Sequence, residues 1–332
     1  MRAFAYSRVT DAAHAVQEAA AGGPVAHFLA GGTTLLDLMK LDVMRPERVI
    51  DINDLAAQFG GIEMRPDGLH LGAFVHMADA ADHPAVRRDY PVIAQSLQLA
   101  ASAQLRNMAT LGGNVLQRTR CTYFRDTSWT HCNKRLAGSG CDAIGGVNRK
   151  HAVLGTSDDC IAAYPGDFAQ ALVALGASLD IVGPSGPRVL DFAALHVVPG
   201  QTPQTETSLA PGELITGFVV PAGPWTRRSL YLKIRDRESY EFALASTAVA
   251  LDLRDGIVRT ARIALGGVAT KPWRASAAEA VLAGQVLDER IARRAADAAF
   301  AGAITHGQND YKPELGRRTL IRALLQAAAM EI

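Results

Sequence analysis

Four cysteines crowd into one stretch of the chain, between residues 121 and 160, and no others occur. Isolated free cysteines usually serve as small core hydrophobes, so this crowding indicates a shared role. The surrounding segment is rich in Gly, Arg, Asn and Ser and shows neither helical nor strand periodicity. Such a segment needs a cross-link to hold one conformation. The four residues are Cys121, Cys132, Cys141 and Cys160.

Two disulfides, one zinc ion or one iron–sulfur cluster could provide that cross-link. Disulfides are typical of small exported chains, whereas 332 residues allow more than one apolar core. Zinc usually binds closely spaced cysteine pairs, and no such pair occurs here. The intervals of ten, eight and eighteen residues leave each thiolate on its own loop, which the four separate corners of a cubane can accept. The spacing favours the cluster, with zinc and disulfides as alternatives.

Basic residues are concentrated in the same segment, which holds only Asp126 and Asp142 as acids between 118 and 150. Local positive charge stabilises thiolates and an electron-rich cluster. Taken singly, each basic residue is better explained as part of a solvated loop. The residues are Arg118, Arg120, Arg125, Lys134, Arg135, Arg149 and Lys150.

The overall charge and hydropathy exclude several classes of function. A formal net charge of +1 gives no long-range field that would attract nucleic acid, so we expect no nucleic-acid partner. No apolar run approaches the roughly eighteen residues of a membrane span, so we expect none. The opening segment MRAFAYSRVTDAAHAV lacks a basic region followed by an apolar core. We therefore expect no export signal on this chain.

A first glycine turn lies in the stretch PVAHFLAGGTTLLDLMK. The pattern predicts a strand over Val25–Ala30, a turn at Gly31 and Gly32, and then a helix. Backbone N–H groups at such a turn can hold a diphosphate. The stretch is neither G-x-G-x-x-G nor a Walker loop, so the Rossmann and P-loop interpretations lose support. Alone, a Gly-Gly pair is more often a simple tight turn.

Two further polar turns strengthen the case for a ligand. The segment RNMATLGGNVLQ places Thr110, Gly112, Gly113 and Asn114 where the chain can approach a phosphate or sugar closely. Asp167 precedes a predicted helix over Phe168–Leu175, either as its N-cap or as a ligand contact. Three such turns at long intervals indicate an extended ligand with the shape of a dinucleotide.

The order of predicted elements indicates the α+β class. The first 55 residues predict a βαβ-like unit with a helix near Asp11–Ala21 and a strand at RVIDIND. Short strands and a helix over Pro91–Ala103 follow. The strands SLYLKI, TAVALDL and RTARIAL precede Ala-rich helices at 276–304 and 314–330.

Pro221, Gly223 and Pro224 end a strand and predict a domain boundary. We predict one domain over 1–224, with subdomains at about 1–55 and 56–224 and a Cys-rich insertion at about 118–162. A C-terminal domain is predicted over 228–332.

Six segments follow one another along nearly the whole chain: FLAGGTT, RNMATLGGNV, PGDFAQALVAL, GELITGFVVP, YLKIRDRESYEFALAS and IALGGVATKPWRA. In this order they resemble the FAD-binding medium subunits of the xanthine dehydrogenase/molybdenum hydroxylase family. The cysteine segment resembles the [4Fe–4S] insertion of a subset of that family, most closely the bacterial periplasmic aldehyde oxidoreductases and more distantly 4-hydroxybenzoyl-CoA reductase.

The resemblance implies an FAD-binding fold of the vanillyl-alcohol-oxidase/p-cresol-methylhydroxylase type with a smaller C-terminal α+β domain. It places Ile215 near the adenine or flavin, and Lys233 near the isoalloxazine or phosphate end. A surface ion pair of Lys233 with Asp236 or Glu238 explains that lysine equally well. The implied FAD-binding residues are Ala30, Gly31, Gly32, Thr33, Thr34, Leu35, Thr110, Gly112, Gly113, Asn114, Asp167, Ile215 and Lys233, and the implied cluster ligands are Cys121, Cys132, Cys141 and Cys160.

One position departs from the family pattern. Many relatives carry Asp before an apolar-Ala pair in the C-terminal domain, and this chain has Glu241 there. We expect the longer side chain to change access to the flavin N5 side.

By resemblance, the chain is an electron-transfer subunit of a molybdenum-dependent oxidoreductase of aldehydes, aromatic ones by expectation. The implied partners are a large molybdenum-cofactor subunit and a small [2Fe–2S] subunit in a heterotrimer, with an external electron acceptor. The implied compartment is the periplasm, reached with a signal-bearing partner, and the alternative is the cytoplasm. The flavin subunit of a xanthine dehydrogenase or hydroxybenzoyl-CoA reductase is the alternative within the family.

Two other classes remain open. A zinc-stapled interaction module would bind no flavin, and a free-standing flavin oxidase would need no partners. His27, His70 and His151 stand alone in the sequence, and solitary histidines are most often structural or solvated. No arrangement predicts a substrate-activating site, which favours the electron-transfer subunit.

Overall fold

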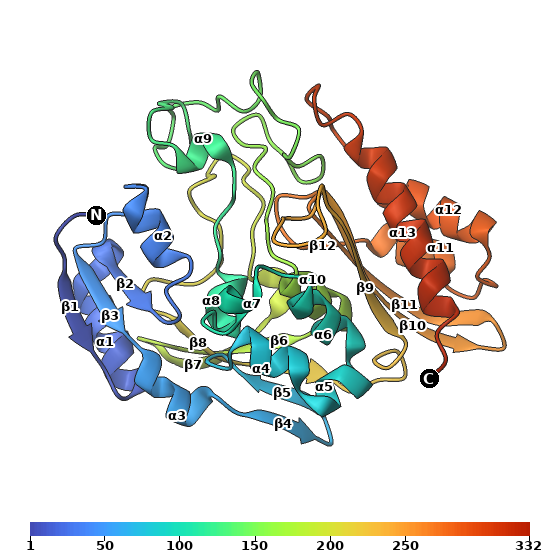
Figure 1. Ribbon diagram of the computed structural model, residues 1–332, viewed down its shortest axis with the longest axis horizontal. Coiled ribbons are helices and arrows are strands. Elements are labelled where there is room, and N and C mark those ends of the chain that lie inside the picture. Colours follow the sequence, from blue (N-terminus) through green and yellow to red (C-terminus); the bar gives the residue numbers. More distant parts are fainter.

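The computed structural model describes residues 1–332 and contains three sheets (Figure 1). The first is parallel, with the order β1-β3-β2. Asp11 caps the first helix by accepting a hydrogen bond from the His14 N–H. The predicted βαβ-like unit is therefore confirmed. Its elements are β1 (Ala5–Arg8), α1 (Ala12–Gly22), η1 (Gly23–Val25), β2 (Ala26–Leu29), α2 (Leu35–Lys40), β3 (Arg48–Asp51), η2 (Asn53–Leu55) and α3 (Ala56–Phe59).

The second sheet is antiparallel, with the order β4-β5-β8-β6-β7. The helix predicted over Pro91–Ala103 is wrong in extent, because Ala101 has a φ of +48° and separates two shorter helices. The strands are β4 (Ile62–Arg65), β5 (Gly68–Gly72), β6 (Ser178–Gly183), β7 (Gly186–Asp191) and β8 (Leu214–Pro221), and the helices are α4 (Met77–Asp82), α5 (Pro84–Asp89), α6 (Pro91–Gln98), α7 (Ala103–Arg106), α8 (Leu111–Val115), α10 (Phe168–Leu175) and η3 (Phe192–Ala194).

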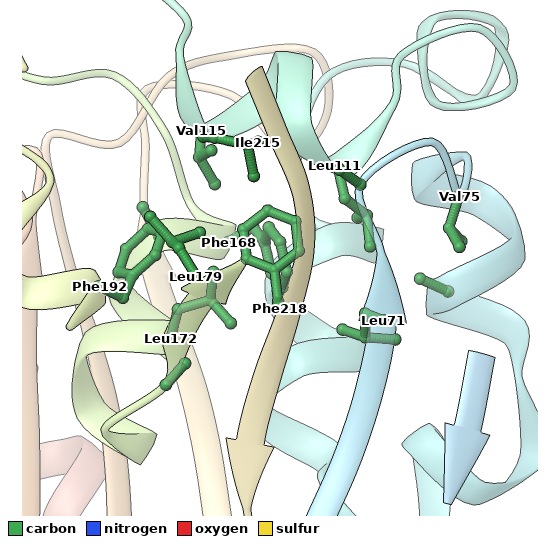
Figure 2. Close-up of a cluster of buried hydrophobic side chains, with 14 of the residues drawn as sticks. Leu71, Val75, Leu111, Val115, Phe168, Leu172, Leu179, Phe192, Ile215 and Phe218 are labelled. Carbon is green, nitrogen blue, oxygen red and sulfur yellow. The ribbon is translucent and has the colours of Figure 1, made fainter. Parts of the chain in front are cut away.

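The main hydrophobic core contains 46 buried residues, most of them on this sheet and its helices, and it extends to residues of α1 and β3 and of the C-terminal part of the chain. Every residue of α10 is buried, as a helix that is apolar at every position except Gln170 predicts. Figure 2 shows Phe168 of α10 against Phe218 of β8, with ring centroids 5.7 Å apart. Val115 and Ile215 lie at the edge of the same cluster, so this core supports both α8 and β8.

The third sheet is antiparallel, with the order β12-β11-β10-β9, and three C-terminal helices pack beside it around 24 buried residues (Figure 1). The helix predicted over 276–304 is interrupted between Leu282 and Glu289. Helices and antiparallel sheets are thus segregated, as the α+β class predicts. The elements are β9 (Ser229–Ile234), β10 (Ala245–Arg254), β11 (Ile257–Gly266), β12 (Trp273–Arg274), α11 (Ser276–Leu282), α12 (Glu289–Ala299) and α13 (Lys312–Ala328).

The cysteine insertion contains little regular structure, as its lack of periodicity predicts. Its only helix is α9 (Thr122–Arg125), and it forms the loops at the top of Figure 1. Val153 and Leu154, near its end, are buried in the C-terminal core. None of the helices in the chain combines the length and hydropathy that a bilayer crossing requires.

Candidate functional site

The first glycine turn packs directly against the segment that leads into the second. A Cβ atom on Gly31 would lie 1.9 Å from the Met108 carbonyl oxygen, so no larger residue fits without moving the backbone. Gly32 has a φ of +73°, which also favours glycine. The N–H groups of residues 31 to 34 donate no backbone hydrogen bond within the chain. They are therefore available to a bound anion.

The second glycine segment differs, because it forms one helical turn, α8, and its N–H groups are already used. Gly112 donates to the Ala73 carbonyl at 2.8 Å, and Gly113 donates to Thr110 Oγ1 at 3.2 Å. The buried Oδ1 atom of Asn114 has no hydrogen-bond partner. This segment thus offers close backbone approach and one unpaired acceptor rather than free N–H groups.

Two adjoining cavities, which share Thr33 and Thr34, form a cleft at these turns. Their volumes are about 280 Å³ and about 450 Å³, so that together they offer the space of a small-molecule site. Ala30, Gly31, Gly32, Thr33, Thr34, Leu35, Thr110, Gly112, Gly113 and Ile215 line the first cavity, and Asn114 and Asp167 line the second.

Asp167 occupies the predicted N-cap position of α10, and its carbonyl accepts from the Gln170 N–H at 3.2 Å, but its side chain makes no capping hydrogen bond. Its carboxylate instead accepts from Lys233 Nζ at 2.7 Å and from the Tyr231 hydroxyl at 2.6 Å. The ion pair is almost completely buried, with side chains 4% and 1% exposed. Lys233 therefore does not pair with Asp236 or Glu238, and it acts on the second cavity through Asp167.

Tyr231 completes this buried group, and sequence analysis missed it. Burial, followed by the charge of Asp167, raises the pKa of Tyr231 well above its ordinary value. The phenol stays protonated and donates, which fixes the carboxylate between two donors. The alternation of YLKI along β9 places Tyr231 and Lys233 on one face, and that period was the signal available in the sequence.

The loop after β9 forms one rim of the second cavity through Tyr240, Glu241 and Phe242. Glu241 pairs at 3.1 Å with Lys150 of the insertion. Arg120, also from the insertion, lies 4.9 Å from the centre of the Phe242 ring. The insertion thus contributes directly to this side of the cleft.

All four cysteines are free thiols and line one small cavity of about 10 Å³, which has room for about one water molecule. The disulfide alternative is not formed. No group of three or more His, Cys, Asp or Glu side chains in the chain could hold a metal ion. Cys132 and Cys141 face each other in an isolated antiparallel bridge. The geometry gathers the predicted ligands at one cavity without forming a single-ion site.

The thiols are shielded from water. Burial raises the pKa of Cys121 to about 12 and that of Cys160 to about 11, so without a positive partner they stay protonated and unreactive. His151 Nε2 lies 3.2 Å from Cys121 Sγ. Sequence analysis treated His151 as solitary and missed this contact, because the two residues are thirty positions apart.

Six of the seven basic residues of the insertion form ion pairs. Four of them are also largely shielded from water, so the solvated-loop interpretation is wrong for Arg118, Arg120, Arg125 and Lys134. Arg149 and Lys150 are paired but remain exposed. Asp37 accepts from Arg120 at 3.1 Å and from Arg125 at 2.7 Å. Arg135 has no carboxylate partner, and its guanidinium donates to backbone carbonyls instead. The other pairs are Arg118 and Lys134 with Glu206, Arg149 with Asp236, and Lys150 with Glu241.

A third cavity, of about 40 Å³, lies between the cysteine cavity and the cleft. It shares Lys134 and Cys160 with the cysteine cavity. It also shares Leu116 with the first cleft cavity and Gln117 with the second. Glu206 lines it, and sequence analysis did not single this residue out. Shared walls thus connect the two predicted cofactor sites.

Two protein-family models match the chain. The FAD binding domain in molybdopterin dehydrogenase matches residues 2–223, and the CO dehydrogenase flavoprotein C-terminal domain matches residues 230–329. The aldehyde oxidoreductase FAD-binding subunit PaoB of Escherichia coli is 46% identical over 331 residues, 99% of each chain. The carbon monoxide dehydrogenase medium chain of Afipia carboxidovorans is 29% identical over 99% of this chain and 96% of its own.

Solved structures have the same fold. Reconstituted CO dehydrogenase from Oligotropha carboxidovorans gives a TM-score of 0.78 at 25% identity, covering 99% of both chains. Carbon monoxide dehydrogenase from Hydrogenophaga pseudoflava gives 0.76 at 28% identity, covering 98% of this chain and 97% of that one. The predicted fold class and family resemblance are confirmed. The chain belongs to the FAD-binding medium subunits of the molybdenum hydroxylase family, oxidoreductase subunits that act within a complex.

Proposed function

We propose that the chain is the FAD- and [4Fe–4S]-binding electron-transfer subunit of a molybdenum-dependent aldehyde oxidoreductase. The complex would oxidise aldehydes, aromatic ones above all, to carboxylic acids, and this subunit would pass the electrons to an external acceptor. The aldehyde class is supported by the 46% identity to a subunit with that printed activity.

The proposed cluster is supported by one observation above all: four free cysteines from separate parts of the insertion line one cavity. In a cubane each thiolate binds a different iron, so the sulfurs need not converge on one point. Zinc requires all four donors at about 2.3 Å from a single ion, and no donor group here could hold one. The cavity of about 10 Å³ means that the loops must separate when a cluster assembles.

In the cleft, bound FAD would supply the redox chemistry, and the chain supplies position and charge. The unpaired N–H groups at residues 31 to 34 suit the diphosphate. Asn114 Oδ1 offers an acceptor at the second cavity, where Lys233 holds the Asp167 carboxylate in one orientation. These assignments extend the predicted FAD-binding set to Tyr231, which fixes Asp167 from the other side.

The proposed partners are a large molybdenum-cofactor subunit and a small [2Fe–2S] subunit in a heterotrimer. Relatives are described as medium chains of carbon monoxide dehydrogenase, which supports a multi-subunit complex. The proposed compartment is the periplasm, with the export signal on a partner.

Absorbance and electron paramagnetic resonance of the anaerobically purified complex test the proposal. We expect flavin bands, a broad iron–sulfur shoulder, and a dithionite-reduced [4Fe–4S] signal in addition to those of [2Fe–2S] clusters. Cys132→Ser should remove the additional signal and leave FAD bound, whereas Asp126→Asn, elsewhere in the insertion, should change neither. One zinc per chain and no [4Fe–4S] signal would contradict the cluster. Oxidation of xanthine in place of aldehydes would contradict the substrate class.

A further inference from the structure

One carboxylate joins the walls of the two proposed cofactor sites. Glu206 Oε1 lies 2.9 Å from Lys134 Nζ, and its other oxygen accepts from Arg118 Nε. Lys134 lines the cysteine cavity, and Arg118 lines the first cavity of the cleft. Glu206 itself lines the small cavity between them. The three charged side chains therefore form a continuous chain of contacts from one site to the other.

The three side chains are partly shielded from water, so that water screens the electrostatic interactions of their charges less than at an exposed site. The exposed fractions are 10% for Lys134, 23% for Arg118 and 26% for Glu206. Lys134 is also held by the Pro203 carbonyl at 2.9 Å. No other Lys or Arg lines the cysteine cavity, although His131 and the carboxylate residue Asp159 line it as well. The positive charge that Lys134 contributes at that cavity therefore depends on how far Glu206 offsets it.

We propose that Glu206 is a positioning residue that sets the electrostatic potential at the cysteine cavity and ties Lys134 to the cleft wall through Arg118. For the cluster, the inference rests on the proposed function. Reduction adds one negative charge to a cluster, so a less neutralised cation nearby favours the reduced form. At separations of about 10 Å in a partly shielded site, one unit of charge changes a redox equilibrium about tenfold.

Three variants separate charge from structure. Glu206→Gln keeps the size and a hydrogen-bonding oxygen but removes the negative charge. Lys134→Gln removes the opposing positive charge. Glu206→Asp keeps the charge and shortens the side chain, so it rescues an electrostatic role but not one that depends on close packing.

Asp236→Asn is the matched control. Asp236 pairs with Arg149 of the insertion at 2.7 Å, yet neither residue lines any of the cavities described. Its removal should leave the potential of the cluster unchanged.

The experiment is a redox titration of the purified complex, followed by the electron paramagnetic resonance signal of the reduced [4Fe–4S] cluster. For Glu206→Gln we expect the ratio of reduced to oxidised cluster at the wild-type midpoint to rise about tenfold, a positive shift of about 59 mV for one electron. Lys134→Gln should shift the midpoint in the opposite direction, the double variant should return near wild type, and Glu206→Asp should stay close to it.

Each other result has a distinct meaning. A wild-type complex without a [4Fe–4S] signal contradicts the proposed function. A normal signal whose midpoint is the same in wild type, Glu206→Gln and Lys134→Gln overturns the role of Glu206 alone. Equal shifts in Glu206→Gln and Asp236→Asn, or in Glu206→Gln and Glu206→Asp, also overturn it, because a general structural change would then explain the effect.

Discussion

The cleft and the cysteine insertion are held together by different forces. The cleft rests on a core of 46 buried residues, and close backbone packing at Gly31 fixes its shape. Apart from Val153 and Leu154, which join the C-terminal core, the insertion is associated with two clusters of only three buried residues each. Ion pairs and side-chain contacts to carbonyls hold it instead. The cleft is thus preformed by the fold, whereas the insertion depends on charged groups from elsewhere in the chain.

Contacts at its far end attach the insertion to the C-terminal domain. Lys312 is completely buried and donates to the Lys150 and Gly267 carbonyls. Asn148 donates to the His306 carbonyl at 2.7 Å, and Asn309 donates to the Ala152 carbonyl at 3.1 Å. The insertion therefore reaches from the cleft to the C-terminal sheet. Because it contains few buried residues of its own, substitutions in it should affect the structure more locally than substitutions in the cleft core.

The largest expected effect comes from the buried ion pair of the cleft. Asp167→Asn leaves the Lys233 ammonium buried without a counter-charge, which costs about 3–5 kcal/mol of unfolding free energy. The urea concentration at the midpoint of unfolding and the FAD content of the purified protein should both fall. The double variant Asp167→Asn/Lys233→Met should recover part of the stability. An Asp167→Asn variant of unchanged stability would contradict the view that the cleft is preformed.

Gly31→Ala tests the backbone contact between the two glycine segments. The added Cβ would overlap the Met108 carbonyl, and overpacking of this kind costs up to about 3 kcal/mol. If the segments move apart, FAD affinity should fall about 100-fold, as measured by flavin fluorescence. Gly61→Ala is the control, since the nearest atom to its Cβ would be a flexible Glu63 side chain at 3.8 Å. Equal FAD affinity in both variants would rule out the contact as essential.

The pH dependence of stability tests a buried hydrogen bond at the end of α8, next to the start of the insertion. His196 Nε2 donates to the carbonyl of Val115, the last residue of α8. Burial lowers the pKa of His196 to about 4, while the unfolded chain binds that proton near pH 6.5. The stabilisation that depends on neutral His196 is therefore fully present above pH 6.5 and is lost as the pH falls towards 4. At pH 5 the free energy of unfolding should be lower by about 2 kcal/mol.

Urea denaturation at pH 7 and pH 5 measures this loss. His196→Gln lowers stability at pH 7 but should reduce the difference between the two pH values. An undiminished difference would assign the acid sensitivity to other groups.

The smallest effect is expected in the insertion. Arg135→Lys replaces a guanidinium that donates to the carbonyls of Tyr123, Phe124, Asp126 and Trp129, and an ammonium cannot reproduce that fork. We expect a local loss of about 1 kcal/mol, seen as faster proteolysis between residues 121 and 160. FAD affinity should not change. Loss of FAD together with faster proteolysis would show that the two regions are not independent.

Local sequence patterns predicted much of the fold and of the candidate site. The largely apolar segment Phe168–Leu175 predicted α10, and the glycine turns predicted where the cleft lies. The broken helix after Gln98 was not predictable, because a positive φ at Ala101 has no signal in the residue type. The FAD-binding and cluster-ligand assignments themselves remain predictions, as do the domain limits.

The sequence by itself determined most of the helices and strands, the glycine turns, the crowding of the cysteines and the family, because periodicity, glycine and residue order are local properties. Only the tertiary structure decided which charges meet. Lys233 pairs with Asp167, which lies 66 residues away in the sequence, and Arg118 pairs with Glu206, 88 residues away. A buried charge must have a partner, but which partner it has depends on how distant segments pack, and no local pattern records that choice.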